Sequence, residues 1–190
     1  ERVKGKLLEE ETIFLKFKRP FKVYMKWVKE PFMGRETLFV EGWNDGLLRA
    51  HEGGIMGIIT ANLDPLGSMA TKRNRHPITD AGLERLVKKS GANLRKGLMN
   101  NEFTLKEHGE EAIGGRKTMK VEAIYPKDKT KGYYCHRSVL NLDFEMKVPI
   151  KIQIFDWDDK LVESYWYEDL RLNAGLTDAD FDPKNPDYRF

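Results

Sequence analysis

The strongest constraint on the fold is the alternation of apolar and polar side chains in the first third of the sequence. The segment 21–27 carries apolar residues at every second position, and the segment 12–18 repeats this pattern on the other side of Arg19-Pro20. Successive side chains of a β-strand point to opposite faces, so period-two alternation is typical of a strand with one buried face. The sequence therefore predicts an antiparallel hairpin over residues 12–27.

Further strand patterns follow this hairpin. Residues 36–41 lead into Asn44-Asp45-Gly46, residue types that readily adopt the positive φ of a tight turn, and residues 47–51 return from it. Beyond residue 100, short turns separate five more runs rich in β-branched or aromatic residues, at 102–107, 118–125, 133–142, 148–155 and 161–172. Short connections between neighbouring strands predict an antiparallel meander of about nine strands.

The middle of the sequence departs from this pattern. Residues 52–77 are rich in glycine and proline, and we interpret them as a long loop or lid. Residues 78–100 form a predicted helical insertion, capped by Thr79 and broken into two pieces at Gly91. The expected fold class is α+β, with a single domain over residues 1–190 in which the helical segment covers one side of a large curved antiparallel β-sheet.

Composition excludes several classes of protein. The chain has 190 residues and a formal charge of 33 − 30 = +3, and no apolar stretch approaches the ~20 residues of a membrane-spanning helix. We therefore expect a protein that is peripheral to a membrane rather than integral. A single cysteine, Cys135, excludes an internal disulfide framework. The sequence begins at Glu1 without methionine or an apolar leader, which predicts a processed form that lacks its signal peptide.

Catalytic motifs are not evident. His51-Glu52 begins like a zinc-protease helix, but Ile55 stands where that motif needs its second histidine. Cys135 and His136 are neighbours in a predicted strand, which points them to opposite faces and argues against a nucleophile and base pair. We predict no catalytic residues, no cofactor and no metal site.

The acidic segment 178–182 has the alternating carboxylates of a calcium loop. It lacks the glycine and the glutamate that such a loop requires, and Pro183 and Arg189 stand at those positions. Capping of a short helix by Thr177 and Asp178 is the better interpretation of these residues.

The predicted binding site is apolar. One helix hardly covers a sheet of about nine strands, so an apolar cavity between them is expected as an alternative to an ordinary core. The residues expected to line it are Phe21, Val23, Met25, Trp27, Leu38, Val40, Leu83, Leu86, Val87 and Ile152.

A basic cluster lies in the long loop. Arg73, Arg75 and His76 are candidate contacts for an anion or a lipid head group, and a solvated loop is the alternative. Nucleic acid is not an expected partner, because the net charge is only slightly positive and no aromatic residues interleave the cluster.

An ordered set of short motifs resembles a known family. Phe17-Lys18-Arg19-Pro20, Tyr24-x-x-Trp27 and Glu41-Gly42 resemble the opening of the LolA/LolB-like lipoprotein carriers. The motifs around Arg75-His76-Pro77 and at 176–181 are similar to a bacterial domain-of-unknown-function family within that group. The resemblance extends over most of the chain.

This resemblance implies a LolA-like half-barrel whose concave face is covered by helices. It also implies a removed export signal, a periplasmic location in a Gram-negative-type envelope, non-covalent binding of acyl chains or another amphiphile, and no catalysis. In the carriers, the arginine of the Lys-Arg-Pro turn helps to hold the lid shut, and Arg19 is the matching residue. The long loop with Arg73, Arg75 and His76 is unlike the loops of these carriers.

Three functional hypotheses follow. The first is a non-catalytic carrier or sensor that binds a lipid, an acylated protein or another amphiphile in an apolar concavity. The second is an envelope protein-protein interaction module that uses exposed sheet edges or the basic loop. The third is an enzyme in which Asp178, Asp180 and a histidine hold a metal, although no ligand spacing supports it.

Overall fold

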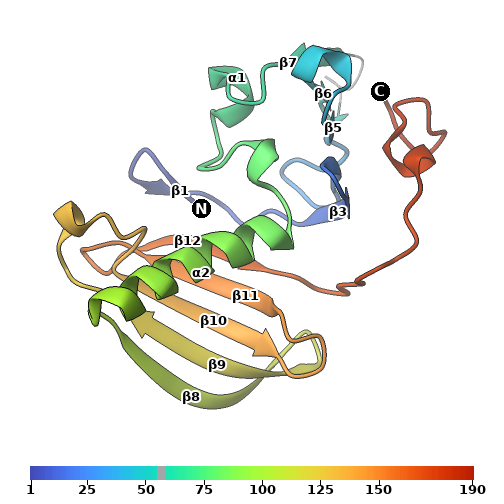
Figure 1. The fold of residues 1–190 in the computed structure, drawn as a ribbon. Coiled ribbons are helices and arrows are strands. Elements are labelled where there is room, and N and C mark those ends of the chain that lie inside the picture. Colours follow the sequence, from blue (N-terminus) through green and yellow to red (C-terminus); the bar gives the residue numbers. More distant parts are fainter. Residues whose placement is uncertain (55–58) are drawn as a thin grey trace. The chain divides into compact units, whose positions relative to one another are not determined.

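The computed structural model describes residues 1–54 and 59–190. These residues group into two compact units. The first unit comprises residues 1–7 and 83–172, and the second comprises residues 8–82 and 173–190. Both units are built mainly from antiparallel strands, with few helices, so the fold is α+β (Figure 1).

The second unit contains a five-stranded antiparallel sheet in sequential order. Its strands are β3 (Ile13–Lys18), β4 (Lys22–Trp27), β5 (Glu36–Val40), β6 (Leu48–His51) and β7 (Thr60–Leu63). The predicted hairpin is confirmed as β3 and β4, and the predicted turn is the 3-10 turn η1 (Asn44–Gly46), in which all three residues have positive φ.

Both faces of this sheet are covered by other parts of the second unit. On one face, Val23, Phe39 and Leu48 pack with residues that follow β7. These residues lie in or beside α1 (Ser68–Thr71) and the 3-10 turn η3 (Ile78–Asp80). On the other face, Tyr24 and Leu38 pack with Phe181 of the 3-10 turn η5 (Asp178–Phe181). Apolar alternation along the strands therefore serves two separate cores.

The first unit contains the second five-stranded antiparallel sheet, in the order β12-β11-β10-β9-β8. Its strands are β8 (Thr104–Ile113), β9 (Arg116–Ile124), β10 (Arg137–Asp143), β11 (Pro149–Phe155) and β12 (Leu161–Trp166). A small hairpin of β1 (Arg2–Val3) and β2 (Lys6–Leu7) lies beside β12, where the Arg2 guanidinium donates to the Leu161 carbonyl oxygen at 3.0 Å. A 3-10 turn, η4 (Lys129–Lys131), precedes β10.

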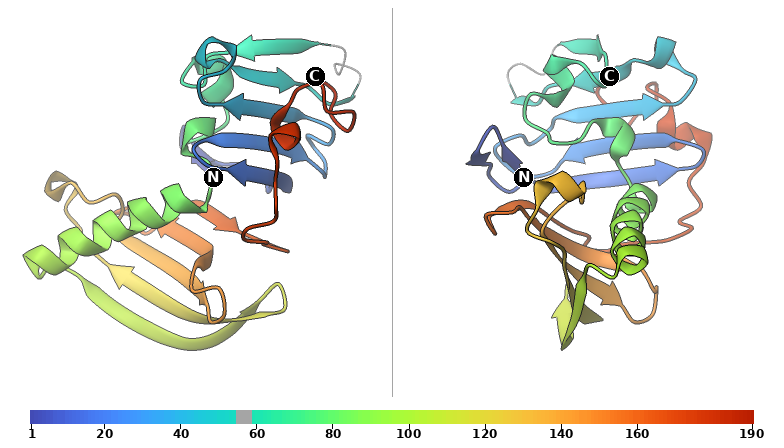
Figure 2. Two further views of the ribbon diagram at one scale, coloured as in Figure 1. Left: turned by 45° about the vertical axis from the view of Figure 1, so that its right-hand side comes forward. Right: turned by 60° about the vertical axis from the view of Figure 1, so that its left-hand side comes forward.

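The helix α2 (Leu83–Asn100) runs along one face of this sheet (Figure 2). Leu86 and Leu94 pack against a core that includes Leu140 and Ile152. Gly97 allows the Phe103 side chain to approach the helix, because a Cβ at Gly97 would lie 3.0 Å from the Cβ of Phe103. Among the described residues, no helix has the length and apolar character needed to cross a membrane.

The structure corrects four expectations. The strands form two five-stranded sheets instead of one sheet of about nine strands, and β7 lies within the segment predicted to be a loop. Thr79 does not cap the long helix, since it lies in η3 and α2 begins at Leu83. Gly91 does not break the helix, which continues through it.

Other expectations about the fold stay predictions. These are the single domain over residues 1–190 and the covering of a concave face by the helix. The predicted lid at 52–77 includes residues 55–58, which lie outside the described part of the chain. Its described part contains β7 and α1.

Candidate functional site

The predicted apolar lining is divided between the faces of the second unit's sheet. In the pairing of β4 with β5, Val23 lies opposite Phe39 and Tyr24 lies opposite Leu38. Directly paired residues share a face, so Val23 and Leu38 lie on opposite faces. The residues predicted to be neighbours therefore fall into two clusters, with Phe21, Val23 and Met25 in one and Leu38 and Val40 in the other.

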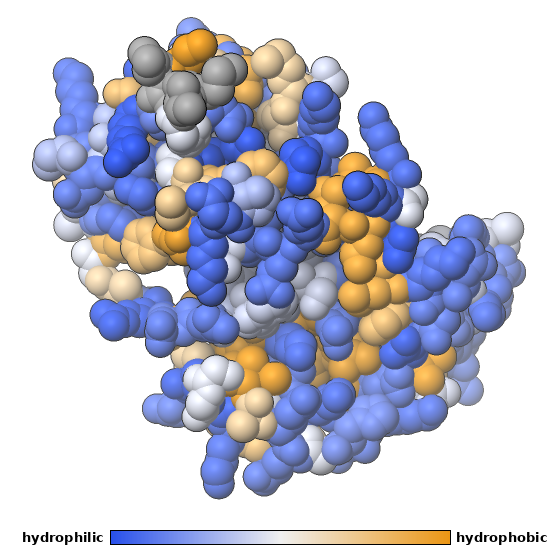
Figure 3. Space-filling view, turned by 180° about the vertical axis from the view of Figure 1, so that it is seen from behind, coloured by the Kyte–Doolittle hydropathy of each residue, from blue (hydrophilic) through white to orange (hydrophobic). Residues whose placement is uncertain are grey.

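The remaining predicted lining residues lie elsewhere. Trp27 is buried, and its indole Nε1 donates to the Glu11 carboxylate at 2.6 Å. Leu86 and Ile152 belong to the core of the first unit, whereas Val87 is 43% exposed and Leu83 is half-buried. Within the second unit, the predicted lining residues are divided between the two faces of the sheet, and the role of the predicted set in ligand binding stays a prediction. On the side seen in Figure 3, hydrophobic residues lie in patches that hydrophilic residues interrupt.

Part of the predicted basic cluster has partners within the second unit. The Arg73 guanidinium carbon lies 4.5 Å from the centroid of the Phe32 ring, and that of Arg35 lies 4.4 Å from the same ring. The Nδ1 atom of His76 is 3.6 Å from the Asp80 carboxylate. The cation-π contact of Arg73 and the contact of His76 with Asp80 help to position the long loop. The head-group role of Arg73, Arg75 and His76 stays a prediction.

Arg19 lies in the exposed turn between β3 and β4. The described part of the predicted lid is seen in one conformation, which does not test whether the lid opens and closes. The role of Arg19 as a lid latch therefore stays a prediction too.

The acidic segment near the end of the sequence has a structural explanation. Thr177 caps η5 in a capping box with Asp180, which confirms the predicted capping by Thr177. Asp178 instead accepts hydrogen bonds from the ammonium groups of Lys18 and Lys22, at 3.0 and 2.8 Å. In the described ranges 1–54 and 59–190, no three His, Cys, Asp or Glu side chains are grouped closely enough to hold a metal ion.

Cys135 has the environment of a core residue. Its side chain is buried, and this burial raises the pKa of the thiol to about 12. The Asn93 side-chain amide donates to its Sγ atom at 3.7 Å. A reactive cysteine needs a lowered pKa and access to solvent, so this environment holds the thiol in its unreactive protonated form.

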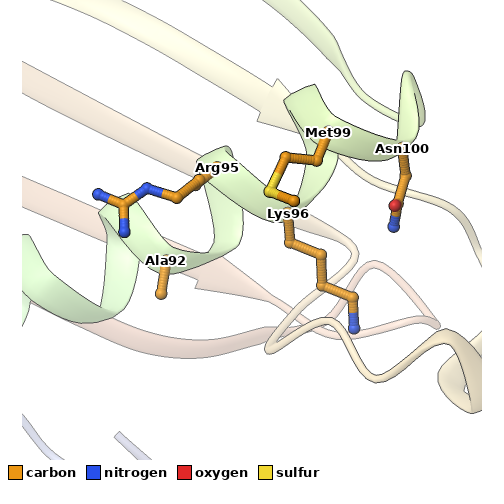
Figure 4. Close-up of a pocket in the computed structure, with 5 residues that line it drawn as sticks. All are labelled: Ala92, Arg95, Lys96, Met99 and Asn100. Atoms are coloured by element: carbon orange, nitrogen blue, oxygen red, sulfur yellow. The ribbon is translucent and has the colours of Figure 1, made fainter.

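A groove on α2 has a different character. Ala92, Arg95, Lys96, Met99 and Asn100 line an open cavity of about 350 Å³ (Figure 4). Met99 is 80% exposed and the neighbouring Leu98 is 65% exposed. We call these five lining residues the α2 groove.

The arrangement of the α2 groove follows from helical periodicity. At about 100° per residue, Ala92 and Met99 fall on one line along the helix. Lys88 and Arg95 lie on one side of this line, and Lys96 lies on the other. The groove therefore has apolar residues along one line of the helix, with basic residues on both sides of this line.

Charge is concentrated on this helix. α2 has five basic residues and one acidic residue, which gives 5 − 1 = +4, whereas the whole chain has +3. The basic residues are Arg85, Lys88, Lys89, Arg95 and Lys96. The remainder of the chain has a formal charge of 3 − 4 = −1. An anionic ligand is therefore attracted more strongly to α2 than to the chain as a whole.

The two cations beside Met99 differ in their contacts. The Lys96 ammonium donates to the carbonyl oxygens of Lys131 and Gly132, at 2.5 and 3.1 Å, and lies 4.9 Å from the Tyr133 ring centroid. Within the described part of the chain, Arg95 has no hydrogen bond or ion pair. Lys96 is therefore fixed, and the Arg95 guanidinium is available to a ligand.

The sequence analysis missed the α2 groove because it assigned the apolar residues Leu83, Leu86 and Val87 of this helix to the lining of the predicted cavity. The signal was present in the sequence as the excess of basic over acidic residues at 83–100. Helical periodicity places these basic residues around Ala92 and Met99, away from Leu86 and Leu94, which are partly buried against the core.

Three structural comparisons show distant likenesses. A DUF1329 family protein from Desulfovibrio piger is 16% identical, with a TM-score of 0.40 over 94% of this chain and 84% of that chain. A chain of the Pseudomonas aeruginosa MucA/MucB complex is 15% identical, with a TM-score of 0.40 over 90% of this chain and 54% of that chain. A putative outer membrane lipoprotein-sorting protein domain from Vibrio parahaemolyticus is 13% identical, with a TM-score of 0.36 over 87% of this chain and 70% of that chain. These likenesses carry no argument about what this chain binds.

No curated protein matches the sequence. One family model matches it, and the match extends over residues 1–190. The chain therefore belongs to the family described as protein of unknown function, DUF1571.

Proposed function

We propose that this chain is a non-catalytic cell-envelope protein that binds an anionic amphiphile, a lipid or an acylated protein, in the α2 groove. The observation that supports the proposal is the exposure of Met99 and Leu98 beside Arg95 and Lys96. Large exposed apolar side chains bordered by charged residues are typical of binding surfaces. The location in the envelope is part of the proposal and rests on the LolA/LolB-like motifs of the sequence.

The α2 groove offers both kinds of contact that an anionic amphiphile needs. Contact with an acyl chain buries the thioether of Met99, and each buried methylene of the ligand contributes about 0.8 kcal/mol. Methionine is flexible and adapts to apolar ligands of different shape. The Arg95 guanidinium forms charge-assisted hydrogen bonds with a phosphate or carboxylate.

The proposal places the amphiphile on α2 instead of in the predicted concavity. Val23, Leu38 and Ile152 are at most 1% exposed and pack within the chain's own clusters. A ligand in contact with these side chains would first have to displace their present neighbours. The α2 groove is open without such a rearrangement.

Vesicle binding tests this function. Purified protein is sedimented with vesicles of phosphatidylglycerol and, separately, of phosphatidylcholine, at low and high salt. We expect binding to the anionic vesicles that weakens as salt rises, because exposed charges are screened within about 10 Å at 0.1 M salt. Organic extraction of the purified protein followed by mass spectrometry identifies any lipid that stays bound.

Matched variants locate the binding surface. Arg95→Gln should weaken binding about fivefold, because one cation near an anionic surface contributes about 1 kcal/mol to the binding free energy. Met99→Gln should weaken it by removing apolar contact, and Lys106→Gln, on the exposed strand β8, is the control with the same charge change as Arg95→Gln. Equal losses for Arg95→Gln and Lys106→Gln would refute a site on α2.

The edge strand β8 favours a second candidate function, a protein-protein interaction. β8 lies at the end of its sheet and pairs with β9 alone, and its side chains are mostly exposed. A partner strand can add to such an edge by main-chain hydrogen bonds. Capture of a partner from an envelope extract by the wild-type protein, lost with Leu105→Asp and kept with Arg95→Gln, would favour this function over amphiphile binding.

A further inference from the structure

One face of the second unit's sheet is strongly basic. The strand register aligns Lys16 with Tyr24, Tyr24 with Leu38, and Leu38 with Arg49, so these residues share a face. The same register adds one acidic residue and several basic ones to this face, namely Lys18, Lys22, Lys26, Glu36 and His51. We call this surface the basic face.

The segment 176–190 covers part of the basic face through acidic side chains. The Asp178 carboxylate lies 2.8 Å from the Lys22 ammonium and 3.0 Å from that of Lys18. The Asp180 carboxylate lies 2.8 Å from the Lys16 ammonium. Hydrogen bonds from Lys22 and Lys18 lower the pKa of Asp178 to about 2. The pKa of Asp180 is also lowered to about 2, and the hydrogen bond from Lys16 is the main cause. Both carboxylates are therefore charged at neutral pH.

Aromatic side chains provide the second set of contacts. The Tyr188 ring stacks on the Tyr24 ring with centroids 3.9 Å apart and an interplanar angle of 12°. Phe190 meets Tyr24 edge to face at 6.3 Å. Phe181 is 4% exposed in the same cluster. The segment thus combines acidic groups with aromatic anchors, the usual composition of a peptide that binds a basic and aromatic surface.

The segment is held mainly by its side chains. It contains one 3-10 turn and no strand, so it adds no ladder of main-chain hydrogen bonds to the sheet. The amide of Arg189 donates to the Glu36 carboxylate at 3.0 Å. A segment bound in this way resembles a docked peptide more than a strand of the sheet (Figure 2).

The basic face also has buried nitrogen atoms that the segment leaves without a partner. The Nε atom of Arg49 and the Nε2 atom of His51 are buried and have no hydrogen-bond partner among residues 1–54 and 59–190. Buried polar groups normally have partners, and leaving one without costs free energy. An acidic ligand that reaches the buried Arg49 Nε–H can accept a hydrogen bond from it, whereas His51 Nε2 donates or accepts according to the tautomer of the ring.

We propose that the basic face is a binding site for an acidic and aromatic peptide segment of a partner protein, and that residues 176–190 occupy this site as an internal competitor. The charge complementarity of Asp178 and Asp180 with three lysines defines what the site recognises. A tethered segment has an effective concentration in the millimolar range, so it suppresses binding of an external peptide until its own contacts weaken. This inference is independent of the α2 groove.

A labelled synthetic peptide with the sequence of residues 174–190 is the probe. It is titrated against the full chain and against the full chain carrying Asp178→Asn and Asp180→Asn, with fluorescence anisotropy as the readout. Weakening the internal segment should free the basic face, so we expect the double variant to bind the probe about tenfold more tightly than the wild type does. Asp187→Asn, a charge change in the same segment, should leave the affinity unchanged.

Two further measurements establish specificity. A probe peptide with asparagine at both aspartate positions should lose binding, and so should the double variant when Lys18→Gln and Lys22→Gln are added to it. Circular dichroism confirms that each variant is folded. The proposal is wrong if a folded double variant binds the probe no better than the wild type, or if it binds the asparagine peptide equally well. The wild-type chain could instead form concentration-dependent dimers that Lys18→Gln and Lys22→Gln abolish. This result would overturn the proposal of a partner protein, because the basic face would then bind residues 176–190 of a second copy of the chain.

Discussion

Two glycines of α2 have opposite surroundings. A Cβ at Gly91 would have no heavy atom within 4 Å apart from its chain neighbours and the nearby backbone of the helix itself. A Cβ at Gly97 would lie 3.0 Å from the Cβ of Phe103. Gly91 therefore costs helix stability without allowing a close approach, and Gly97 allows the packing of Phe103.

This difference predicts opposite effects of one substitution at two positions of one helix. Gly91→Ala should raise the free energy of unfolding by about 0.5–1 kcal/mol, the usual difference in helix propensity. Gly97→Ala should lower it by about 1–3 kcal/mol, because the new methyl group overpacks the contact with Phe103. Urea denaturation of both variants checks the prediction, and a loss of stability in Gly91→Ala would contradict it.

Asp143 provides a pH-dependent contribution to stability in the first unit. Its carboxylate accepts hydrogen bonds from the Arg116 guanidinium at 2.5 and 3.1 Å, and these bonds hold its pKa well below the ordinary value of 3.8. A pKa that is lower in the folded state gives a stabilisation that is complete above the unfolded value and is lost as pH falls towards the folded value.

The pH dependence of a neutral variant tests this contribution. At pH 7, Asp143→Asn should be less stable than the wild type. The difference should shrink as pH falls below about 3.8, where the unfolded carboxyl binds its proton. The measurement is the free energy of unfolding between pH 2 and pH 7, and a difference that stays constant over this range would argue against the ion pair as its source.

At the scale of secondary-structure elements, the segment 176–190 depends on the stacking of Tyr188 on Tyr24. Tyr188→Ala should lower the free energy of unfolding by about 2 kcal/mol, through lost burial and lost ring contact. Tyr188→Phe keeps the ring and removes only the hydroxyl, which donates to the Asp180 carbonyl oxygen at 2.6 Å, so a loss of about 1 kcal/mol is expected. Chemical denaturation checks both variants, and equal losses would show that the hydroxyl contributes more than the ring.

The elements were more predictable than their pairing. Alternation within each strand identified β3 and β4, because it depends only on neighbours in sequence. It does not reveal which residues of β4 and β5 lie side by side, since the loop at 28–35 sets that register. This is why Val23 and Leu38 were expected on one face and lie on two. The strand β7 was missed because its four residues follow a glycine-rich stretch.

At the scale of the whole chain, local pattern did not reveal that the strands divide between two sheets. Nine predicted strands joined by short connections are compatible with one sheet or with two, because the choice depends on contacts distant in sequence. The same limit applies to the candidate sites. The charges of α2 are visible in the sequence, but the partners that fix Lys96 come from residues 131 and 132, and Asp178 finds its lysines about 160 positions earlier.

Cys135 gives the molecule an internal reporter. The chain has one cysteine, it is 2% exposed, and its thiol stays protonated at neutral pH. A thiol reagent can therefore modify the protein only when the core of the first unit opens. The rate of labelling then measures how often this core opens. No probe has to be introduced, and no second cysteine contributes to the signal.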